Sequence, residues 1–167
     1  MNLKYISLLL FLLFNFQKQG SKNNLSAFDT LINKTWVAEG KWGNNSNFKQ
    51  EVTFKYGLDK KIIIVTSKGF TNIEQTKYGL RNHGIRKFDS KTNKIKFWEF
   101  DVFGGLTEGT VSFKGKNIIY TYNYQGTEVT DMWEYVNNSL YNFKVGVYKD
   151  DSWKNVFLST QFILKKG

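Results

Sequence analysis

The stretch FKQEVTFKY, residues 48–56, alternates apolar and polar side chains along the chain. Phe48, Val52, Phe54 and Tyr56 fall on one face, while Lys49, Glu51, Thr53 and Lys55 fall on the other. A period of two is the pattern of a β-strand with one buried and one solvated face. The segments IIYTYNY (118–124) and LYNFKVGVY (140–148) repeat it. The alternation therefore predicts that the following side chains point inward: Phe48, Val52, Phe54, Tyr120, Tyr122 and Phe143.

Turn-forming residues separate these runs at nearly regular spacing, as in Gly43-Asn44-Asn45-Ser46 and Gln125-Gly126-Thr127. Each such cluster is typical of a hairpin connection. Counting the runs between turns predicts about ten strands. The expected ranges are 35–42, 47–56, 61–68, 80–88, 94–101, 107–114, 118–125, 129–136, 140–148 and 153–164.

Short connections between consecutive strands predict an all-β, antiparallel up-and-down β-barrel of about eight to ten strands, since closure removes both exposed edges. A two-sheet sandwich of the same strands is the open alternative. One short N-terminal helix is expected over Ser26–Lys34, with Ser26 as its N-cap.

The first residues have the layout of a secretory signal peptide: Lys4, an apolar run from Tyr5 to Phe16, and a polar stop before Gly20. The run is too short for a membrane-spanning helix, which needs about 20 apolar residues. We expect residues 1–20 to be the signal peptide and residues 21–167 to form a single β-barrel domain. A secreted or periplasmic location follows, without stable membrane insertion after signal removal.

Composition excludes several classes of chemistry. The chain has no cysteine, so disulfides, zinc–thiolate sites and iron–sulfur clusters are ruled out. Its formal net charge of +10 comes almost wholly from lysine, because Arg81 and Arg86 are its only arginines. Specific phosphate or base recognition usually uses the arginine fork, so nucleic acid is not expected as a partner. The charge indicates a soluble, lysine-rich surface, with an anionic polysaccharide or a membrane surface as the alternative partner.

No catalytic or metal-binding motif is complete. Glu99 and Asp101 share a strand face, as in the E-x-D-x-x-E strand of laminarinase-type glycosidases, but Gly104 holds the third position and Glu108 comes four residues late. His83 is the only histidine, and one histidine without cysteine cannot build a zinc site. Haem ligation by His83 is the less favoured interpretation. We therefore expect no enzyme, no metal and no cofactor.

The inward aromatic side chains either fill the core or line a hollow barrel that admits one small ligand. Polar residues on the same faces, Gln50, Glu99 and Asp131, favour the hollow. A buried carboxylate is costly alone, so each needs a ligand, a water or a basic partner such as Arg81 or Arg86. The candidate ligand site places an apolar body against Phe48, Phe97, Tyr122 and Trp133, and a polar end at Arg81, His83 or Glu99. In this hypothesis Arg81 and His83 share one strand face.

The segment HGIRKFDSKTNKIKFWEFDVFGGLTEGTVSFKGKNIIYTY, residues 83–122, resembles the DUF1579-type bacterial family of unknown function. The resemblance is carried by Gly84, Phe88-Asp89, Trp98 to Asp101, Gly104-Gly105 and Glu108-Gly109. The opening LINKTWVAEGKW, residues 31–42, is similar to the entry of calycin and lipocalin barrels, with Lys34 where that pattern has glycine. The resemblance implies a calycin-like barrel and no established activity.

Three functions compete on these observations. The first is an exported barrel that binds a small amphipathic or hydrophobic ligand. The second is a carbohydrate-binding or surface-interaction module that uses exposed aromatics such as Trp42, Trp98 and Trp153. The third is an enzyme with an unrecognised carboxylate pair. A closed cavity with convergent polar groups favours the first function, and a flat aromatic platform favours the second.

Overall fold

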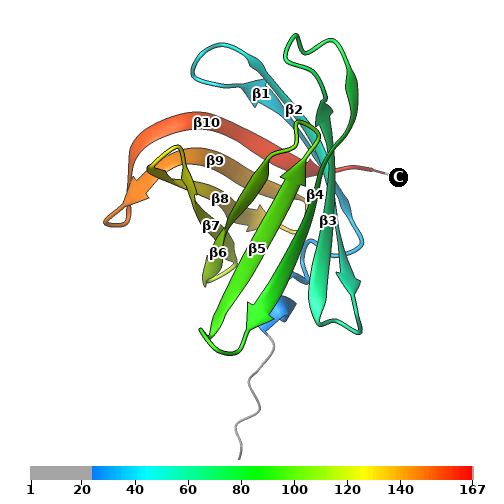
Figure 1. Ribbon diagram of the computed structural model, residues 1–167, viewed down its shortest axis with the longest axis vertical. Coiled ribbons are helices and arrows are strands. Elements are labelled where there is room, and N and C mark those ends of the chain that lie inside the picture. The colour runs from blue at the N-terminus through cyan, green and yellow to red at the C-terminus, as the bar shows by residue number, and fades with distance from the viewer. Residues whose placement is uncertain (1–23, 167) are drawn as a thin grey trace, which may run out of the picture.

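The computed structural model describes residues 24–166, which form ten β-strands and one short 3-10 helix (Figure 1). The elements are η1 (Asn24–Phe28), β1 (Thr35–Lys41), β2 (Asn47–Gly57), β3 (Ile62–Phe70), β4 (Tyr78–Asp89), β5 (Lys94–Asp101), β6 (Leu106–Lys114), β7 (Asn117–Tyr124), β8 (Thr127–Asn137), β9 (Leu140–Lys149) and β10 (Ser152–Leu164). The expected strands lie within a few residues of these bounds.

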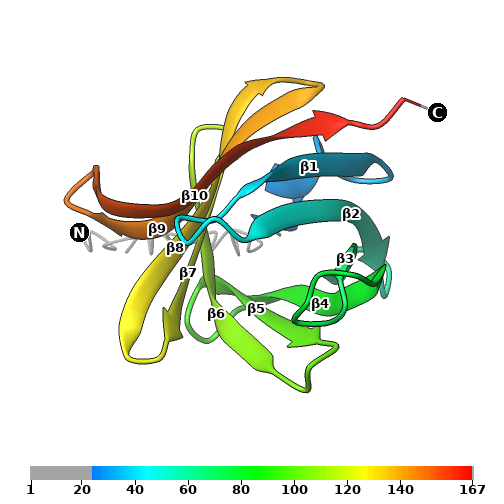
Figure 2. The same ribbon diagram turned by 90° about the horizontal axis from the view of Figure 1, so that it is seen from above.

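Each strand pairs antiparallel with the next along the chain, and β1 also pairs with β10. The sheet is therefore a closed barrel, which confirms the predicted up-and-down architecture and excludes the open sandwich. Figure 2 looks down on this barrel, with the strands following one another around its wall.

The seam between the first and last strands is short. Ladder pairing joins Trp36 to Leu164 and Val37 to Ile163. Farther along, the Thr160 hydroxyl donates to the Glu39 carbonyl at 2.6 Å. An isolated bridge pairs Trp42 with Leu158. The sheet is thus closed by backbone pairing together with a side-chain hydrogen bond.

The N-terminal segment closes one end of the barrel, at the bottom of Figure 1. The helix predicted over residues 26–34 is wrong in extent, because only the 3-10 helix η1 forms and turns follow it. Leu25, Phe28 and Leu31 are fully buried, so this segment serves as a hydrophobic plug. Tertiary contacts hold it there: the Asn33 amide donates to the Phe54 carbonyl at 2.9 Å.

Aromatic rings fill the interior above the plug. Trp133 stacks on Phe162 with ring centroids 4.1 Å apart and contacts Phe54, Tyr141 and Phe143 edge-on. The inward prediction is confirmed: the members that are buried are Val52, Phe54, Tyr120 and Phe143, while Phe48 and Tyr122 are partly buried and pack against the core.

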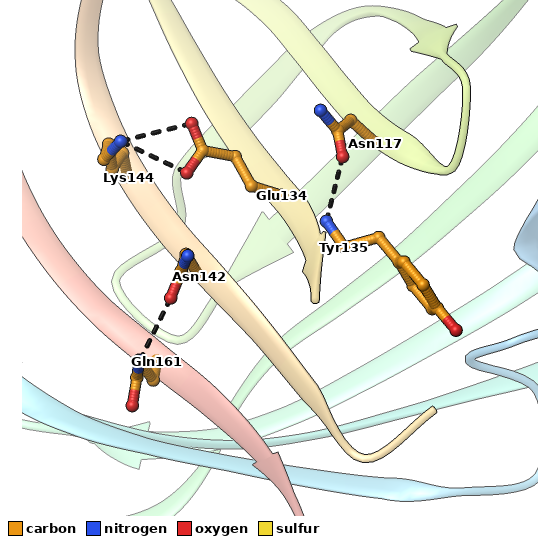
Figure 3. Close-up of polar contacts among 6 residues, drawn as sticks. All are labelled: Asn117, Glu134, Tyr135, Asn142, Lys144 and Gln161. Atoms are coloured by element: carbon orange, nitrogen blue, oxygen red, sulfur yellow. Dashed lines mark hydrogen bonds and ion pairs between the residues drawn. The ribbon is translucent and has the colours of Figure 1, made fainter. Parts of the chain in front are cut away.

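Polar side chains tie neighbouring strands together from β7 to β10 (Figure 3). The Asn117 side chain of β7 accepts a hydrogen bond from the Tyr135 amide of β8 at 2.9 Å. Between β8 and β9, Lys144 forms an ion pair with Glu134 at 3.1 Å. Gln161 of β10 donates to Asn142 of β9 at 3.0 Å. These contacts connect neighbouring strands laterally.

The predicted signal peptide, residues 1–20, lies outside the described residues. Within residues 24–166, no helix has the length and apolar character needed to cross a membrane.

Replacing Phe54 by alanine tests the packing of the closed half. Phe54 is 2% exposed and its ring meets those of Phe28 and Trp133. We expect Phe54→Ala to lower the free energy of unfolding by about 3–5 kcal/mol in denaturant titrations. The control Ile73→Ala removes a side chain that is 85% exposed, and should change stability by no more than about 0.5 kcal/mol. Equal effects of the two substitutions would contradict the assigned core.

Candidate functional site

The half of the barrel away from the plug is hollow. A cavity of about 340 Å³ opens between the β1–β2, β3–β4 and β5–β6 connections. Six of the seven side chains predicted for the ligand site line it: Phe48, Arg81, Phe97, Glu99, Tyr122 and Trp133. Both interpretations of the aromatic residues therefore apply, one to each half of the barrel: the plugged half is filled and the other half is hollow.

The exception is His83, which is exposed and does not line the cavity. The register of β3 against β4 shifts between Ser67–Asn82 and Lys68–Leu80, so that Arg81 is an extra residue. Such a bulge changes the alternation of side chains along a strand. Arg81 and Asn82 consequently both line the cavity, whereas His83 pairs with Thr66 on the outer face. The prediction that Arg81 and His83 share a face is wrong for this reason.

A buried ion pair forms one wall of the cavity. Arg86 and Glu99 face each other across β4 and β5, with Nη1 and Oε2 2.6 Å apart and only 7% and 17% of their side chains exposed. The guanidinium lies over the rings of Phe97 and Tyr120, at 5.5 and 5.1 Å from their centroids. Its Nε donates to the Tyr120 hydroxyl at 3.3 Å. Of the alternatives that the sequence left open for Glu99, a ligand, a water or a basic partner, the structure shows a basic partner, Arg86.

Gly84 makes room for this pair. It lies opposite Glu99 in the ladder between β4 and β5. A Cβ atom at this position would collide with Glu99 Oε2 and Arg86 Nη1. The absence of a side chain therefore lets both charged groups lie against the backbone of β4.

Asp131 is the second carboxylate deep in the cavity. Its Oδ1 accepts a hydrogen bond from the Tyr122 hydroxyl at 2.9 Å. Among the described residues no salt bridge joins Asp131 to a basic side chain. Burial raises the pKa of Asp131 to about 7, and the nearby charge of Glu99 adds to this rise. The hydrogen bond from Tyr122 and the charge of Arg86 act in the opposite direction. Asp131 is consequently poised to gain or lose a proton near neutral pH.

The carboxylates that the sequence paired have separate structural roles. Glu99 is neutralised by Arg86. Asp101 Oδ1 accepts the amides of Phe103 and Gly105, each at 2.8 Å, and so stabilises the β5–β6 turn. Within residues 24–166, no group of three or more acidic or histidine side chains is placed to hold a metal ion.

The tryptophans proposed for a binding platform are dispersed. Trp42 packs edge-on against Phe48 at the mouth, with ring centroids 5.7 Å apart. Trp153 contacts Tyr148 at the start of β10, and Trp98 lies on β5 opposite Ile85. In the described part of the chain no ring contact joins these tryptophans to one another. They are half-buried rather than exposed, which contradicts their assignment as exposed aromatics.

Exposed apolar side chains gather instead on the β3–β4 and β5–β6 hairpins that border the mouth. This apolar rim comprises Ile73, Tyr78, Leu80, Phe100, Val102, Phe103 and Leu106. Arg81 connects the two hairpins, because its guanidinium lies 5.1 Å from the Phe103 ring centroid and its carbonyl accepts the Val102 amide at 2.8 Å. A second depression borders the β1–β2 and β7–β8 connections and shares Trp42, Tyr122 and Val145 with the cavity.

The fold and the site thus define a ten-stranded barrel, plugged at one end, with a mixed aromatic and charged cavity at the other. No protein-family model and no curated protein matches the chain. The resemblance to the DUF1579-type family stays a prediction.

The buried ion pair can be tested by a double-mutant cycle. Arg86→Met should lower the free energy of unfolding by about 3–5 kcal/mol, because it leaves the Glu99 carboxylate buried without its partner. Adding Glu99→Leu should recover part of this loss, since no unpaired charge remains. Denaturant titration of the four proteins measures the coupling. Additive effects would show that the two residues do not interact.

Asp131 should make stability depend on pH. Its pKa of about 7 in the folded state exceeds the ordinary aspartate value of about 3.9, so folding favours its protonated form. The contribution of Asp131 to stability therefore falls as pH rises from about 4 to 7, by at most about 1.4 kcal/mol per pH unit. The difference in unfolding free energy between wild type and Asp131→Asn should follow this slope and level off above pH 7. A difference that is constant with pH would show that the carboxyl titrates normally.

Proposed function

We propose that this protein is an exported binding protein that holds one small amphipathic molecule in the open half of its barrel. The single observation that carries the proposal is the cavity of about 340 Å³ with its mixed lining. Small-molecule sites are typically concave, aromatic or apolar in most of their surface, and equipped with a few placed polar groups.

The cavity is lined by both aromatic and charged side chains, which supports an amphipathic ligand rather than a wholly apolar one. Phe48, Phe97 and Trp133 offer aromatic surface for an apolar body. Glu99 and Asp131 bring carboxylates to the same space. A core evolved only for packing would exclude such charged groups, because burying them is costly. Their presence beside open volume supports a ligand that carries a polar group.

The size of the cavity favours a small ligand. Its volume corresponds to roughly eleven water molecules at about 30 Å³ each. This is near the lower end of the range for ligand pockets. The apolar rim beside the mouth is a surface that the apolar part of the ligand can contact before it enters the cavity. Export is proposed from the signal-like residues 1–20 alone.

Blocking the cavity from one strand tests the proposal. Thr107 lines the cavity, whereas the next residue of β6, Glu108, is exposed. We expect Thr107→Trp to weaken binding of alkyl amphiphiles at least tenfold, while Glu108→Trp serves as the matched control and binds like wild type. Quenching of tryptophan fluorescence and calorimetry measure the affinity.

The proposal fails if no member of an amphiphile panel binds wild type below roughly 100 μM, or about −5.5 kcal/mol. It also fails if both tryptophan variants bind equally well. Such results would favour the surface-interaction module, for which the apolar rim would then be the candidate surface.

A further inference from the structure

We propose that the ligand carries a cationic amine group, held at the Asp131 carboxylate among the aromatic side chains of the cavity. This inference rests on the proposed function and specifies the chemistry of the ligand's polar end. Three features of the cavity carry it: its charge balance, its aromatic walls and the position of Asp131.

Once Lys49 is counted with its ion-pair partner Glu39, the charged side chains that line the cavity include one more carboxylate than cation. Arg86 and Glu99 neutralise each other at 2.6 Å. At the mouth, Arg81 donates to the Phe70 carbonyl and lies over Phe103, while Asp101 accepts the amides of its own turn. No salt bridge involves either of these two side chains in the described part of the chain. Lys49 borders the cavity, but its ammonium group forms an ion pair with Glu39 at 2.7 Å. Asp131 is left as a carboxylate without a basic partner within the described residues.

One oxygen of Asp131 is available to a ligand. Tyr122 donates to Oδ1 at 2.9 Å, and no hydrogen bond to Oδ2 is found among the described residues. A buried carboxylate gains most from a donor that carries positive charge, since charge-assisted hydrogen bonds are roughly twice as strong as neutral ones. An ammonium group at Oδ2 would supply both the donor and the missing charge.

The surrounding rings suit the same ligand. Phe48, Phe97, Tyr122, Trp133 and Phe143 all line the cavity. The faces of aromatic rings attract ammonium groups, and the attraction is strongest where the contact is desolvated. The structure already shows this preference once, because the Arg86 guanidinium lies over the rings of Phe97 and Tyr120. At Asp131, an anionic head group would instead meet ring faces and a carboxylate that has no ion-pair partner among the described residues.

Binding of an amine should therefore depend on the protonation of Asp131. The charged and titratable groups that face it are Tyr120 and Tyr122 of β7, Glu99 of β5 and Arg86 of β4. Its ladder partner on β9, Val145, does not titrate. Burial raises the pKa of both tyrosines, so they remain neutral over the range that matters. Asp131 is thus the group expected to change charge near pH 7.

Three probes with the same tail separate the head groups: octylammonium, octanol and octanoate. Calorimetry with the full chain at pH 8.5 should show octylammonium binding at least tenfold more tightly than the other two. Lowering the pH to 5.5 should weaken octylammonium binding about thirty-fold, because about 3% of a carboxyl with a pKa of 7 is ionised there. The primary amine stays charged throughout, since alkyl amines titrate near pH 10.4.

Two variants test whether Asp131 causes the preference for octylammonium and its pH dependence. Asp131→Asn keeps the shape of the side chain and should abolish both the preference for octylammonium and the pH dependence, while retaining octanol binding as a sign that it is folded. His83→Gln removes the histidine on the outer face and should leave both properties intact. Non-specific attraction cannot imitate the result, because the net charge of +10 favours octanoate.

The outcomes separate this inference from the proposed function. If octanol or octanoate binds as tightly as octylammonium, or if Asp131→Asn binds the amine unchanged, the cationic ligand is refuted while the binding function stands. If neither these three probes nor any other member of the amphiphile panel binds wild type, both are refuted. If wild type prefers the amine and Asp131→Asn does not, the assignment of Asp131 is established.

Discussion

Closure of the sheet is the constraint on which the rest of the molecule depends. The ladder pairs of β1 with β10 involve only Trp36 and Val37 on the β1 side, yet they remove both free edges. In a barrel of eight strands, side chains can just fill the interior. This barrel has ten strands and is therefore wider. The extra interior space is occupied differently at the two ends of the barrel. Large rings and the N-terminal plug fill one end, and the other remains open.

Side chains packed in the filled half hold the walls of the hollow half in place. Trp133 belongs to both, because it stacks on Phe162 in the packed layer and also lines the cavity. The cavity wall is similarly fixed from within, since the Arg86–Glu99 pair is enclosed by aromatic rings and lies against Gly84. Removing one partner of such a pair would be costly, because the other charge would remain buried without compensation. Asp131 has no such ion pair among the described residues, and its carboxylate beside open volume supports the proposal of a cationic ligand in this half of the barrel.

The candidate site could be predicted in part from the sequence. Phe48, Phe97 and Tyr122 reach the cavity because strict alternation along an antiparallel strand determines the face of each residue. Arg81 also reaches it, but His83 does not, because a bulge changes the alternation between them. No residue type in RNHG marks such a bulge, and it becomes visible only when β3 and β4 are paired. Likewise, the sequence could not decide whether Arg81 or Arg86 would be the basic partner of Glu99. The strand register places Arg86 beside it.

By itself, the sequence determined the fold class, the ten strands and the inward faces, because alternation and turn residues are local properties of the chain. It could not determine the N-terminal plug, since Asn24–Phe28 forms a short 3-10 helix held by burial of Leu25 and Phe28 rather than by helical periodicity. Only the tertiary structure decided which half of the barrel is filled and which of the two carboxylates Glu99 and Asp131 has a cationic partner within residues 24–166. Both depend on distances between side chains from different strands, and those distances are set by register and closure rather than by any segment of the sequence.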